Sequence, residues 1–413
     1  MAIRNWGEFP LDVAIEIADK IEFFEDVEAF AGVCTCWRRA AKLAERSSSS
    51  RQKPWLMLAE PPRTSYRRFY SLYNSKVRQV DLAAPSTTRH RTALGSSSLL
   101  FPPKEYKKES VWRYFSSCGW LICVTQIGLD IILMHPLSGQ KIQTPALPVT
   151  ILQTKVNLKW HDRLYLHIFH KFALSESPST TRDYTMAMII SSTLAFWGSG
   201  NDNWWTTPNE SYQTEFKDVI FYKGEFYAIR FAGDIRHVQV VACGNTSPCT
   251  PRLVVELGCY EDSYSDKFYL VESVGMLLLV SRKVAKSFNK HEQEYAYKTA
   301  SFKVWEVNVI DGILTQVNSL GNRALFVGFT SSFSVESSFG KFWNKYYDMA
   351  DCIYYTDDLL ELYYLSEGGH DIGVYNLISG KNTTDHYQGF SRFSVVTPPL
   401  WVETPRLFTA STV

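Results

Sequence analysis

Carboxylate side chains are densest in the last quarter of the chain. Asp357 and Asp358 are adjacent, Glu361 follows them, and Asp348 and Asp351 come shortly before. Paired carboxylates perform acid and base chemistry in glycosidases, where they flank a cleft that holds a sugar. Acidic residues are also common in turns at strand ends, because their side chains hydrogen-bond the local backbone. Nothing in the sequence brings these residues together across a cleft, so we interpret them as turn residues.

Histidine spacing gives no metal site. His291 and Glu292 begin the zinc motif H-E-x-x-H, but Tyr295 stands where the second histidine is needed. His167 and His170 are three residues apart, which puts them on opposite faces of a strand. The nucleophile motif G-x-S-x-G and the phosphate-binding motif G-x-x-x-x-G-K-[ST] are missing from the sequence. We therefore expect no catalytic residue, no metal and no cofactor.

Aromatic residues on predicted loops are better candidates for a binding surface. Trp197, Trp204 and Trp205 lie beside a turn rich in glycine and asparagine, and Trp343 lies among lysines and tyrosines. Exposed aromatic side chains often supply most of the binding energy of a protein interface. Buried aromatic side chains would instead fill the space between sheets. We predict that the four tryptophans bind a target protein, with the buried interpretation as the alternative.

Strand signals dominate from residue 55 to the C-terminus. Short segments rich in β-branched and aromatic residues are separated by turn-forming residues. One typical unit has an apolar strand at 219–222, a turn at Lys223 and Gly224, and a second apolar strand at 226–229. Comparable units recur at roughly 45–55 residues, about the length of a propeller blade of four strands. The pattern favours a β-propeller of about six blades, and a large β-sandwich or two stacked β-domains is the alternative.

Two polar segments interrupt the strand pattern. Residues 286–298 are rich in lysine and glutamate, and residues 174–183 are rich in serine, threonine and proline. We expect the first to be an extended surface loop within a hairpin and the second to be irregular. Loops at the rim of a propeller commonly bind partners.

Three short helical patterns precede the strands. Val13, Ile17 and Ile21 recur at i, i+4 and i+8 and therefore share one helix face. Asp26 and Thr35 are predicted to cap a second and a third helix. So small a unit cannot bury all of its large apolar side chains, which leaves an apolar face that needs a partner. A helical cap packed on the rest of the chain is the alternative.

The order of residues in this helical module resembles an F-box, whose pattern is Leu-Pro-x-Asp/Glu-Leu, then Asp-Leu, then Val-Cys-x-x-Trp-Arg. The matching residues here are Phe9, Pro10, Asp12, Val13, Asp26, Val27, Val33, Cys34, Trp37 and Arg38. The resemblance implies binding to a Skp-type adaptor, and through it to a cullin–RING ubiquitin ligase. The adaptor-facing residues that it implies are Phe9, Pro10, Val13, Ile17, Val33, Cys34 and Trp37.

The remainder of the chain is similar to a large plant family of F-box proteins with a kelch-like propeller. The blocks that carry this likeness are residues 218–228, 269–280, 319–326, 352–358 and 373–377. The resemblance implies a propeller and leaves the target protein open. The expected fold is thus mostly β with a small all-α N-terminal module: an F-box at 1–46, a linker at 47–54 and a propeller at 55–413.

Composition limits the partners. The 43 basic residues nearly balance the 42 acidic ones, so no overall charge favours nucleic acid or a membrane. Arg4, Glu8 and Asp12 come before any apolar run, and we expect no signal peptide and an intracellular protein of the cytoplasm, the nucleus or both. The F-box resemblance implies the substrate-recognition subunit of a Skp–cullin–F-box ubiquitin ligase, which is not itself an enzyme. The alternative is a stand-alone propeller enzyme or carbohydrate-binding protein with a structural helical cap.

Overall fold

The computed structural model places three helices before a long series of strands. The helices are α1 (Leu11–Asp19), α2 (Phe24–Ala31) and α3 (Thr35–Ala44). None of these described helices is long and apolar enough to cross a membrane. The residues that the structure describes are 10–21, 24–44, 54–59, 66–72, 75–82, 112–125, 130–148, 151, 168–191, 193–208, 214–232, 237–244, 249–259, 266–289, 294–330, 332–336, 349–359, 371–383 and 398–403.

The helix starts differ in part from those expected. Helix α1 begins directly after Pro10, its N-cap residue, and Asp12 lies in its first turn. The expected cap at Asp26 is wrong, because α2 begins at Phe24 and Asp26 lies inside its first turn, where negative charge is also favourable. Thr35 is the first residue of α3 and not its cap. Cys34 precedes the helix, and its Sγ accepts a hydrogen bond from the backbone N–H of Trp37 at 3.4 Å, the bond that a capping side chain makes.

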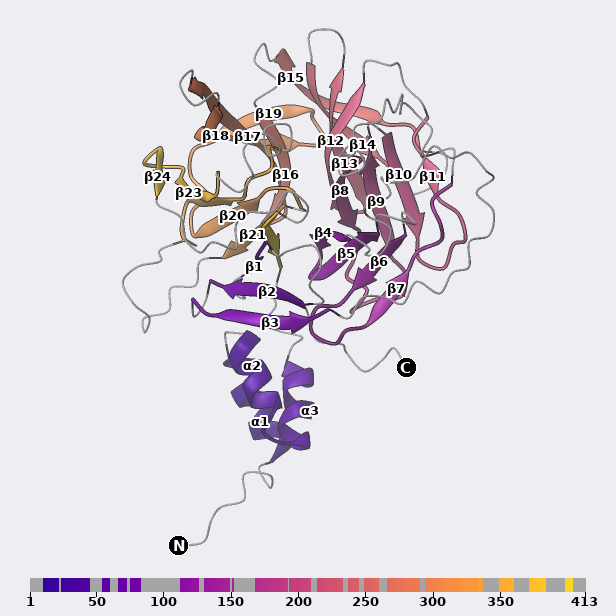
Figure 1. The fold of residues 1–413 in the computed structure, drawn as a ribbon, viewed down its shortest axis with the longest axis vertical. Coiled ribbons are helices and arrows are strands. Elements are labelled where there is room, and N and C mark those ends of the chain that lie inside the picture. The colour runs from indigo at the N-terminus through magenta and orange to yellow at the C-terminus, as the bar shows by residue number, and fades with distance from the viewer. Residues whose placement is uncertain are drawn as a thin grey trace, which may run out of the picture.

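The described strands form six sheets arranged around a ring (Figure 1). We number them as blades in chain order. Blade 1 has β25 (Leu400–Val402), β1 (Trp55–Met57), β2 (Tyr66–Ser71) and β3 (Val77–Asp81); blade 2 has β4 (Trp112–Ser117), β5 (Trp120–Thr125), β6 (Ile131–Met134) and β7 (Lys141–Gln143); blade 3 has β8 (Phe169–Leu174), β9 (Thr185–Ile190), β10 (Thr193–Gly198) and β11 (Trp205–Thr206).

The other three blades include the longest strands. Blade 4 has β12 (Glu215–Tyr222), β13 (Glu225–Ala232), β14 (His237–Cys243) and β15 (Arg252–Cys259); blade 5 has β16 (Lys267–Ser273), β17 (Met276–Asn289), β18 (Glu294–Asn308) and β19 (Ile313–Val317); blade 6 has β21 (Phe333–Glu336), β20 (Arg323–Val327), β22 (Cys352–Tyr355), β23 (Gly373–Asn376) and β24 (Lys381–Thr383). The predicted turn between β12 and β13 is confirmed, with positive φ at both Lys223 and Gly224.

Six buried apolar clusters hold the ring together, one between each pair of neighbouring blades. Between blades 2 and 3, for example, the rings of Phe115 and Phe172 lie 4.7 Å apart. Between blades 3 and 4, those of Phe196 and Phe226 lie 5.4 Å apart. A strand buried on both faces needs no polar alternation, which explains the continuous apolar runs in the sequence.

The two ends of the propeller meet in blade 1. Strand β25 pairs antiparallel with β1, so the C-terminal strand completes the N-terminal sheet. Its side chains alternate: Leu400 and Val402 pack in the cluster shared with blade 2, and Trp401 packs in the cluster shared with blade 6. Every sheet thus contacts two different neighbours, which confirms the six-bladed propeller and excludes the sandwich.

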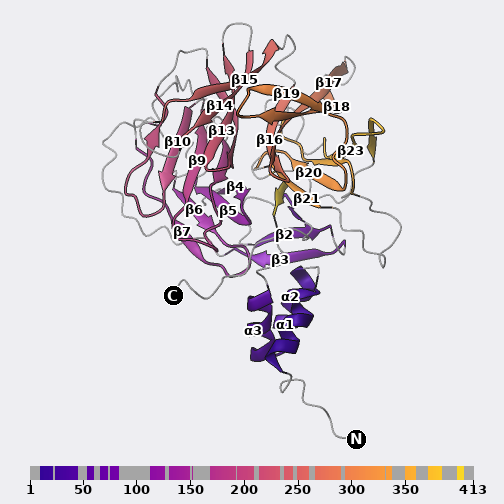
Figure 2. The same ribbon diagram turned by 180° about the vertical axis from the view of Figure 1, so that it is seen from behind.

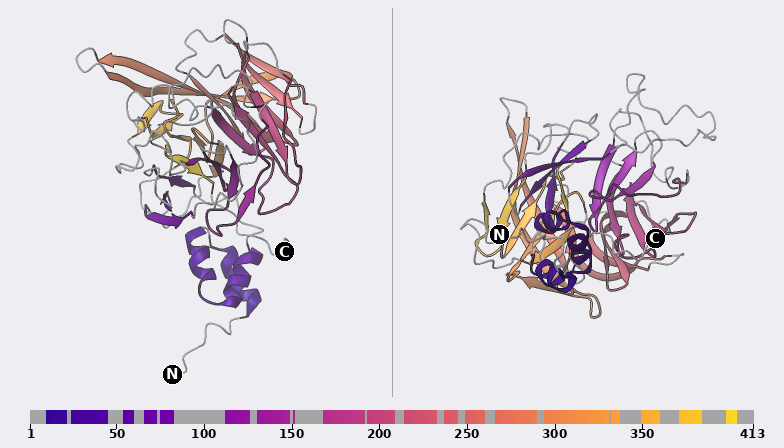
Figure 3. Two further views of the ribbon diagram at one scale, coloured as in Figure 1. Left: turned by 45° about the vertical axis from the view of Figure 1, so that its right-hand side comes forward. Right: turned by 90° about the horizontal axis from the view of Figure 1, so that it is seen from below.

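Two features depart from a regular blade. Blade 6 has a fifth strand, and its β20 and β22 run parallel. In blade 5, β17 and β18 are far longer than their neighbours and project from the ring, as the left view of Figure 3 shows. The expected loop over 286–298 is therefore wrong in part, because β17 continues to Asn289 and β18 begins at Glu294.

The helical module lies outside the ring, next to β3 of blade 1 (Figure 2). The last helix ends at Ala44 and the first strand begins at Trp55. The predicted linker at 47–54 lies almost entirely within residues 45–53, which are outside the described part of the chain. The predicted domain limits therefore stay a prediction.

Candidate functional site

Alanines and two larger apolar residues form the core of the helical module. The described residues buried in it are Ala14, Ala18, Val27, Phe30, Ala40, Ala41 and Ala44. Leu11, Ile15, Ile21, Ala31 and Trp37 are partly buried and pack against this core. The module thus buries some of its large apolar side chains and leaves others outside.

Branched side chains lie on the outside of this module. Val13 and Ile17, both on α1, are each 37% exposed, and Val33, just before α3, is 52% exposed. Leu43 near the end of α3 is exposed as well. An apolar side chain gains about 25 cal/mol for each Å² that it removes from water. Each of these four side chains would therefore gain free energy from contact with an apolar partner.

The remaining predicted adaptor residues are less exposed. Pro10 is exposed, whereas Cys34 and Trp37 are half-buried. The Trp37 ring stacks on Phe30 at 4.3 Å, so it also supports the module internally. Phe9 lies outside the described residues. Adaptor contact through this set stays a prediction.

The predicted target-binding tryptophans lie mostly inside blade 3. Trp197 and Trp204 are 4% and 7% exposed, and Trp205 is half-buried. Both buried indoles donate hydrogen bonds to backbone carbonyls: Trp197 to Asn201 at 2.9 Å and Trp204 to Pro145 of blade 2 at 3.1 Å. Such burial fits the alternative that we gave, in which the rings fill the space between blades. Trp343 lies outside the described residues.

A cleft of about 550 Å³ runs between the outer parts of blades 2 and 3. Its lining residues include Tyr184 and Trp197 together with the side chains of Gln140, Gln143 and Asn201. Burial raises the pKa of Tyr184 to about 12. The cleft is rich in amides and hydroxyls, and none of the paired carboxylates singled out in the sequence lines it.

Buried polar side chains occupy the centre of the ring. Lys171 of blade 3 contacts Asp218 of blade 4 at 3.1 Å and donates a hydrogen bond to the carbonyl of Gly328 in blade 6 at 3.2 Å. Asp218 also accepts a hydrogen bond from the backbone N–H of Leu270 in blade 5. Burial raises the pKa of Asp218, and the Lys171 ammonium opposes that rise. Four blades are thus tied together near the axis by two charged side chains.

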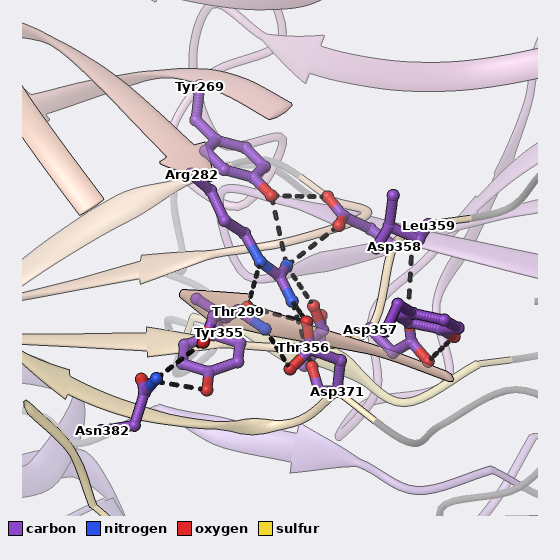
Figure 4. A network of polar contacts seen from close by, with 11 residues as sticks. Tyr269, Arg282, Thr299, Tyr355, Thr356, Asp357, Asp358, Leu359, Asp371 and Asn382 are labelled. Atoms are coloured by element: carbon purple, nitrogen blue, oxygen red, sulfur yellow. Dashed lines mark hydrogen bonds and ion pairs between the residues drawn. The ribbon is translucent and has the colours of Figure 1, made fainter. Parts of the chain in front are cut away.

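A second buried network joins blades 5 and 6 around Arg282 (Figure 4). The Arg282 side chain is fully buried and forms ion pairs with Asp358 at 3.0 Å and Asp371 at 2.8 Å. Its Nε donates to Thr299 at 2.8 Å, and one Nη donates to the carbonyl of Thr356 at 2.8 Å. A planar guanidinium suits such a site because it presents five donors in a fixed geometry.

The neighbouring carboxylate, Asp357, belongs to the same network. It accepts a hydrogen bond from the Tyr297 hydroxyl at 2.6 Å. Burial raises the pKa of Asp357, and the Tyr297 hydrogen bond opposes the rise. The Tyr269 hydroxyl donates to Asp358 at 2.8 Å. Our interpretation of Asp357 and Asp358 as turn residues is wrong, because both are buried between blades, where they hold Arg282 and Tyr297.

The arrangement has the properties of a structural clamp. A substrate would need access to the carboxylates, and Asp357 and Asp358 are almost completely buried. Within the described ranges, no group of three or more histidine, cysteine or acidic residues could hold a metal ion. The seven cysteine side chains that the structure describes form no disulfide bond with one another. Sequence reasoning missed Arg282, because no motif or neighbouring residue distinguishes it from a surface arginine.

Known proteins with a similar sequence point to one family. A family model described as KIB1-4 beta-propeller matches residues 69–376, which is more than half of the chain. The chain is similar to "Putative F-box protein At1g65770" of Arabidopsis thaliana, with 22% identity over 386 residues, 89% of this chain and 93% of the relative. It is also similar to "F-box protein At2g26160" of the same plant, with 23% identity over 353 residues, 81% of this chain and 91% of the relative.

Solved structures add little. A chain from the crystal structure of a nidogen/laminin complex aligns with 85% of this chain and 99% of its own length, at 9% identity and a TM-score of 0.36. A likeness this low carries no argument. The family model and the plant relatives do not indicate an enzyme family. They fit the resemblance to plant F-box proteins with a propeller, and the kelch-like character of the blades stays a prediction.

Proposed function

The chain belongs to the KIB1-4 β-propeller family, and we propose that it is the substrate-recognition subunit of a Skp–cullin–F-box ubiquitin ligase. In this function the helical module binds a Skp-type adaptor and the propeller binds the target protein. The names of the plant relatives support an F-box substrate receptor at the level of the family. Other subunits transfer ubiquitin, so this chain needs no catalytic residue.

The observation that carries the proposal is the exposed apolar surface of the helical module. Val13, Ile17 and Val33 stay exposed to water, whereas Val27, Phe30 and five alanines are buried in the core of the module. Burying such side chains in an interface stabilises a complex by about 1 kcal/mol or more for each residue. An internal cap would turn these side chains toward the propeller, whereas here they remain exposed with the propeller present.

The alternative of a propeller enzyme or carbohydrate-binding protein has less support. Glycoside hydrolysis needs two carboxylates facing a sugar-sized cleft. Inside the protein, Asp357 instead accepts a hydrogen bond from Tyr297, and Asp358 forms an ion pair with Arg282. Stacking on a sugar needs an exposed aromatic face, and Trp197 in the cleft between blades 2 and 3 is only 4% exposed.

Co-purification with a Skp-type adaptor tests the proposal. The full chain and a version that lacks residues 1–46 are each co-expressed with a tagged adaptor, and the complex is quantified by size-exclusion chromatography. We expect a stable complex that contains only the full chain. Equal recovery of the shortened chain would contradict adaptor binding through the helical module.

Point variants make the test independent of truncation. Ile17→Asp and Val33→Asp each place a carboxylate on the exposed apolar surface, where an adaptor would have to desolvate it at a cost of several kcal/mol. We expect each to weaken the complex at least ten-fold while the far-ultraviolet circular dichroism stays unchanged. The matched control is Arg39→Asp, which adds the same group at an exposed position of α3. Binding that survives both Ile17→Asp and Val33→Asp would refute the assignment of this surface.

A further inference from the structure

The hairpin of β17 and β18 extends beyond the rest of blade 5. Pairing of β16 with β17 stops at Lys267 and Arg282, and pairing of β19 with β18 covers only residues 304–308. Beyond Arg282 the sheet therefore has two strands, residues 283–289 and 294–301, which we call the arm. It projects from the ring in the left view of Figure 3. A two-stranded hairpin is only marginally stable alone, so this one needs support.

The Arg282 network and its surroundings supply that support on one face of the arm. Val284 and Tyr297 pack with Leu359 in a buried cluster. The Tyr297 hydroxyl donates to Asp357, and both the backbone N–H and the hydroxyl of Thr299 donate to Asp371, at 3.0 and 2.7 Å. One face of the arm is thus fixed to blade 6 by apolar burial and by charge-assisted hydrogen bonds.

The opposite face of the arm displays lysines. In the register of the hairpin, Lys283 lies opposite Ser301 and Lys298 lies opposite Ala285. Lys303, opposite Ser281 at the base of the arm, is on the same face. All three lysines are exposed. A β-bulge between Lys283 and Val284 adds one residue, Ala300, to β18. Side chains otherwise alternate between the two faces of a strand, so this register puts the three lysines on one side, with small residues between them.

The three lysines are close enough to form one electrostatic surface. Diagonal neighbours on paired strands are about 7–8 Å apart, so Lys283 is adjacent to both Lys303 and Lys298. In the part of the chain that the structure describes, no ion pair joins any of the three to a carboxylate.

Unpaired like charges at adjacent positions repel each other, and a partner that brings carboxylates removes that cost. In an extended polypeptide, alternate side chains lie on one side at about 6.6–6.8 Å, close to the lysine spacing. We propose that this lysine face of the arm binds an acidic, extended segment of the target protein. The inference rests on the proposed function, since it assigns the kind of target that the receptor takes.

Charge favours a protein segment over nucleic acid as the occupant. The whole chain carries a net charge of only +1, so attraction is confined to this patch. Three lysines neutralise about three phosphates, which gives weak and strongly salt-dependent binding to DNA or RNA. A short acidic segment matches both the number of charges and their spacing.

Fluorescence anisotropy with the purified full chain and its adaptor tests the proposal. The probe is a labelled peptide of six alternating Glu–Ser pairs, with a Lys–Ser peptide and a labelled dT12 oligonucleotide as comparisons. The test variant is Lys283→Gln/Lys298→Gln/Lys303→Gln. The matched control is Lys223→Gln/Lys286→Gln/Lys381→Gln, which removes three exposed lysines elsewhere, including Lys286 on the other face of the arm.

We expect the Glu–Ser peptide to bind the wild type and to bind the test variant about ten-fold more weakly, the combined effect of three exposed ion pairs. The control should bind within two-fold of the wild type. Three results would each overturn the proposal: no binding of the Glu–Ser peptide, equal losses in the two triple variants, or tighter binding of dT12 that depends on the same three lysines. Because the substitutions leave the helical module intact, adaptor co-purification reports separately on the proposed function.

Discussion

Arg282→Met is the substitution that best tests the structural argument. Methionine fills much of the same space but cannot neutralise a charge. The five N–H groups of the wild-type guanidinium make six hydrogen-bond contacts, three of them from one Nη, and these include the ion pairs with Asp358 and Asp371. The substitution leaves both carboxylates buried with no cation, in a site that water does not reach.

The size of the effect follows from that burial. Breaking a buried ion pair by removing one partner typically costs 3–5 kcal/mol, because the other charge stays uncompensated. Asp358 and Asp371 share a single arginine, so their losses are coupled and do not add in full. We expect a loss of about 5 kcal/mol in the free energy of unfolding. That is a large part of the roughly 5–15 kcal/mol that stabilises a typical protein.

A second variant separates lost charge compensation from lost packing. In Arg282→Met/Asp358→Asn/Asp371→Asn the carboxylates become neutral amides that still form hydrogen bonds. Replacing all members of a buried ion-pair network by neutral residues costs far less than removing the cation alone, which leaves uncompensated carboxylates. We therefore expect the triple variant to recover about 2 kcal/mol or more relative to Arg282→Met alone.

Urea unfolding followed by tryptophan fluorescence at pH 7.5 measures both variants. The reasoning is refuted if Arg282→Met loses less than about 1 kcal/mol, the value expected of an ordinary surface substitution. It is equally refuted if the triple variant is no more stable than Arg282→Met, because packing and not charge would then explain the loss.

Three further predictions concern neighbouring parts of the ring. Burial raises the pKa of Asp357 above its value in the unfolded chain, so the wild type loses stability as the pH rises from the ordinary carboxyl pKa of about 4 through the folded-state pKa. Asp357→Asn cannot ionise and can still accept from Tyr297, so its stability relative to the wild type should rise over that range in urea unfolding; a constant difference would argue against this. Trp401→Ala should cost about 3–5 kcal/mol in the same assay, because this buried side chain of the closing strand packs against blade 6, and a smaller loss would mean that the space collapses. Gly328→Ala should lower the melting temperature by several degrees in calorimetry, because a Cβ there overlaps Thr356 Oγ1 of the adjoining strand end; an unchanged melting temperature would count against so close an approach.

The six blades could be predicted because the signals that define them are local. An apolar strand, a glycine turn and a second apolar strand recur along the chain, and the hairpin at Lys223 and Gly224 forms where that pattern indicates. The irregular pairing in blade 6 could not be predicted. Strands β20 and β22 pair directly and run parallel although β21 lies between them in the sequence, and no local pattern indicates this.

The buried networks could not be predicted for a different reason. Arg282 meets Asp358 and Asp371, which lie 76 and 89 residues further along the chain. The pattern of apolar residues along a strand indicates which face of the strand is buried. It does not indicate which residues of the next blade contact that face. A charged residue within a strand normally indicates exposure, and this expectation fails at Arg282 because its charge is compensated by another blade.

The buried network and the exposed lysines of blade 5 are physically linked. In Figure 1 the helical module lies below blade 1, and β17 and β18 lie on the far side of the ring. A receptor that holds its target at a distance from the adaptor gains from a stiff arm, because a mobile one would lose binding energy to ordering. Thr299 is fixed by Asp371 on one face of the arm, and the next residue, Lys298, lies on the other face.

We therefore expect Arg282→Met, assayed where it is still folded, to weaken binding of the acidic peptide even though Arg282 does not contact the peptide. Unchanged peptide binding by a folded Arg282→Met protein would show that the lysine face needs no such support.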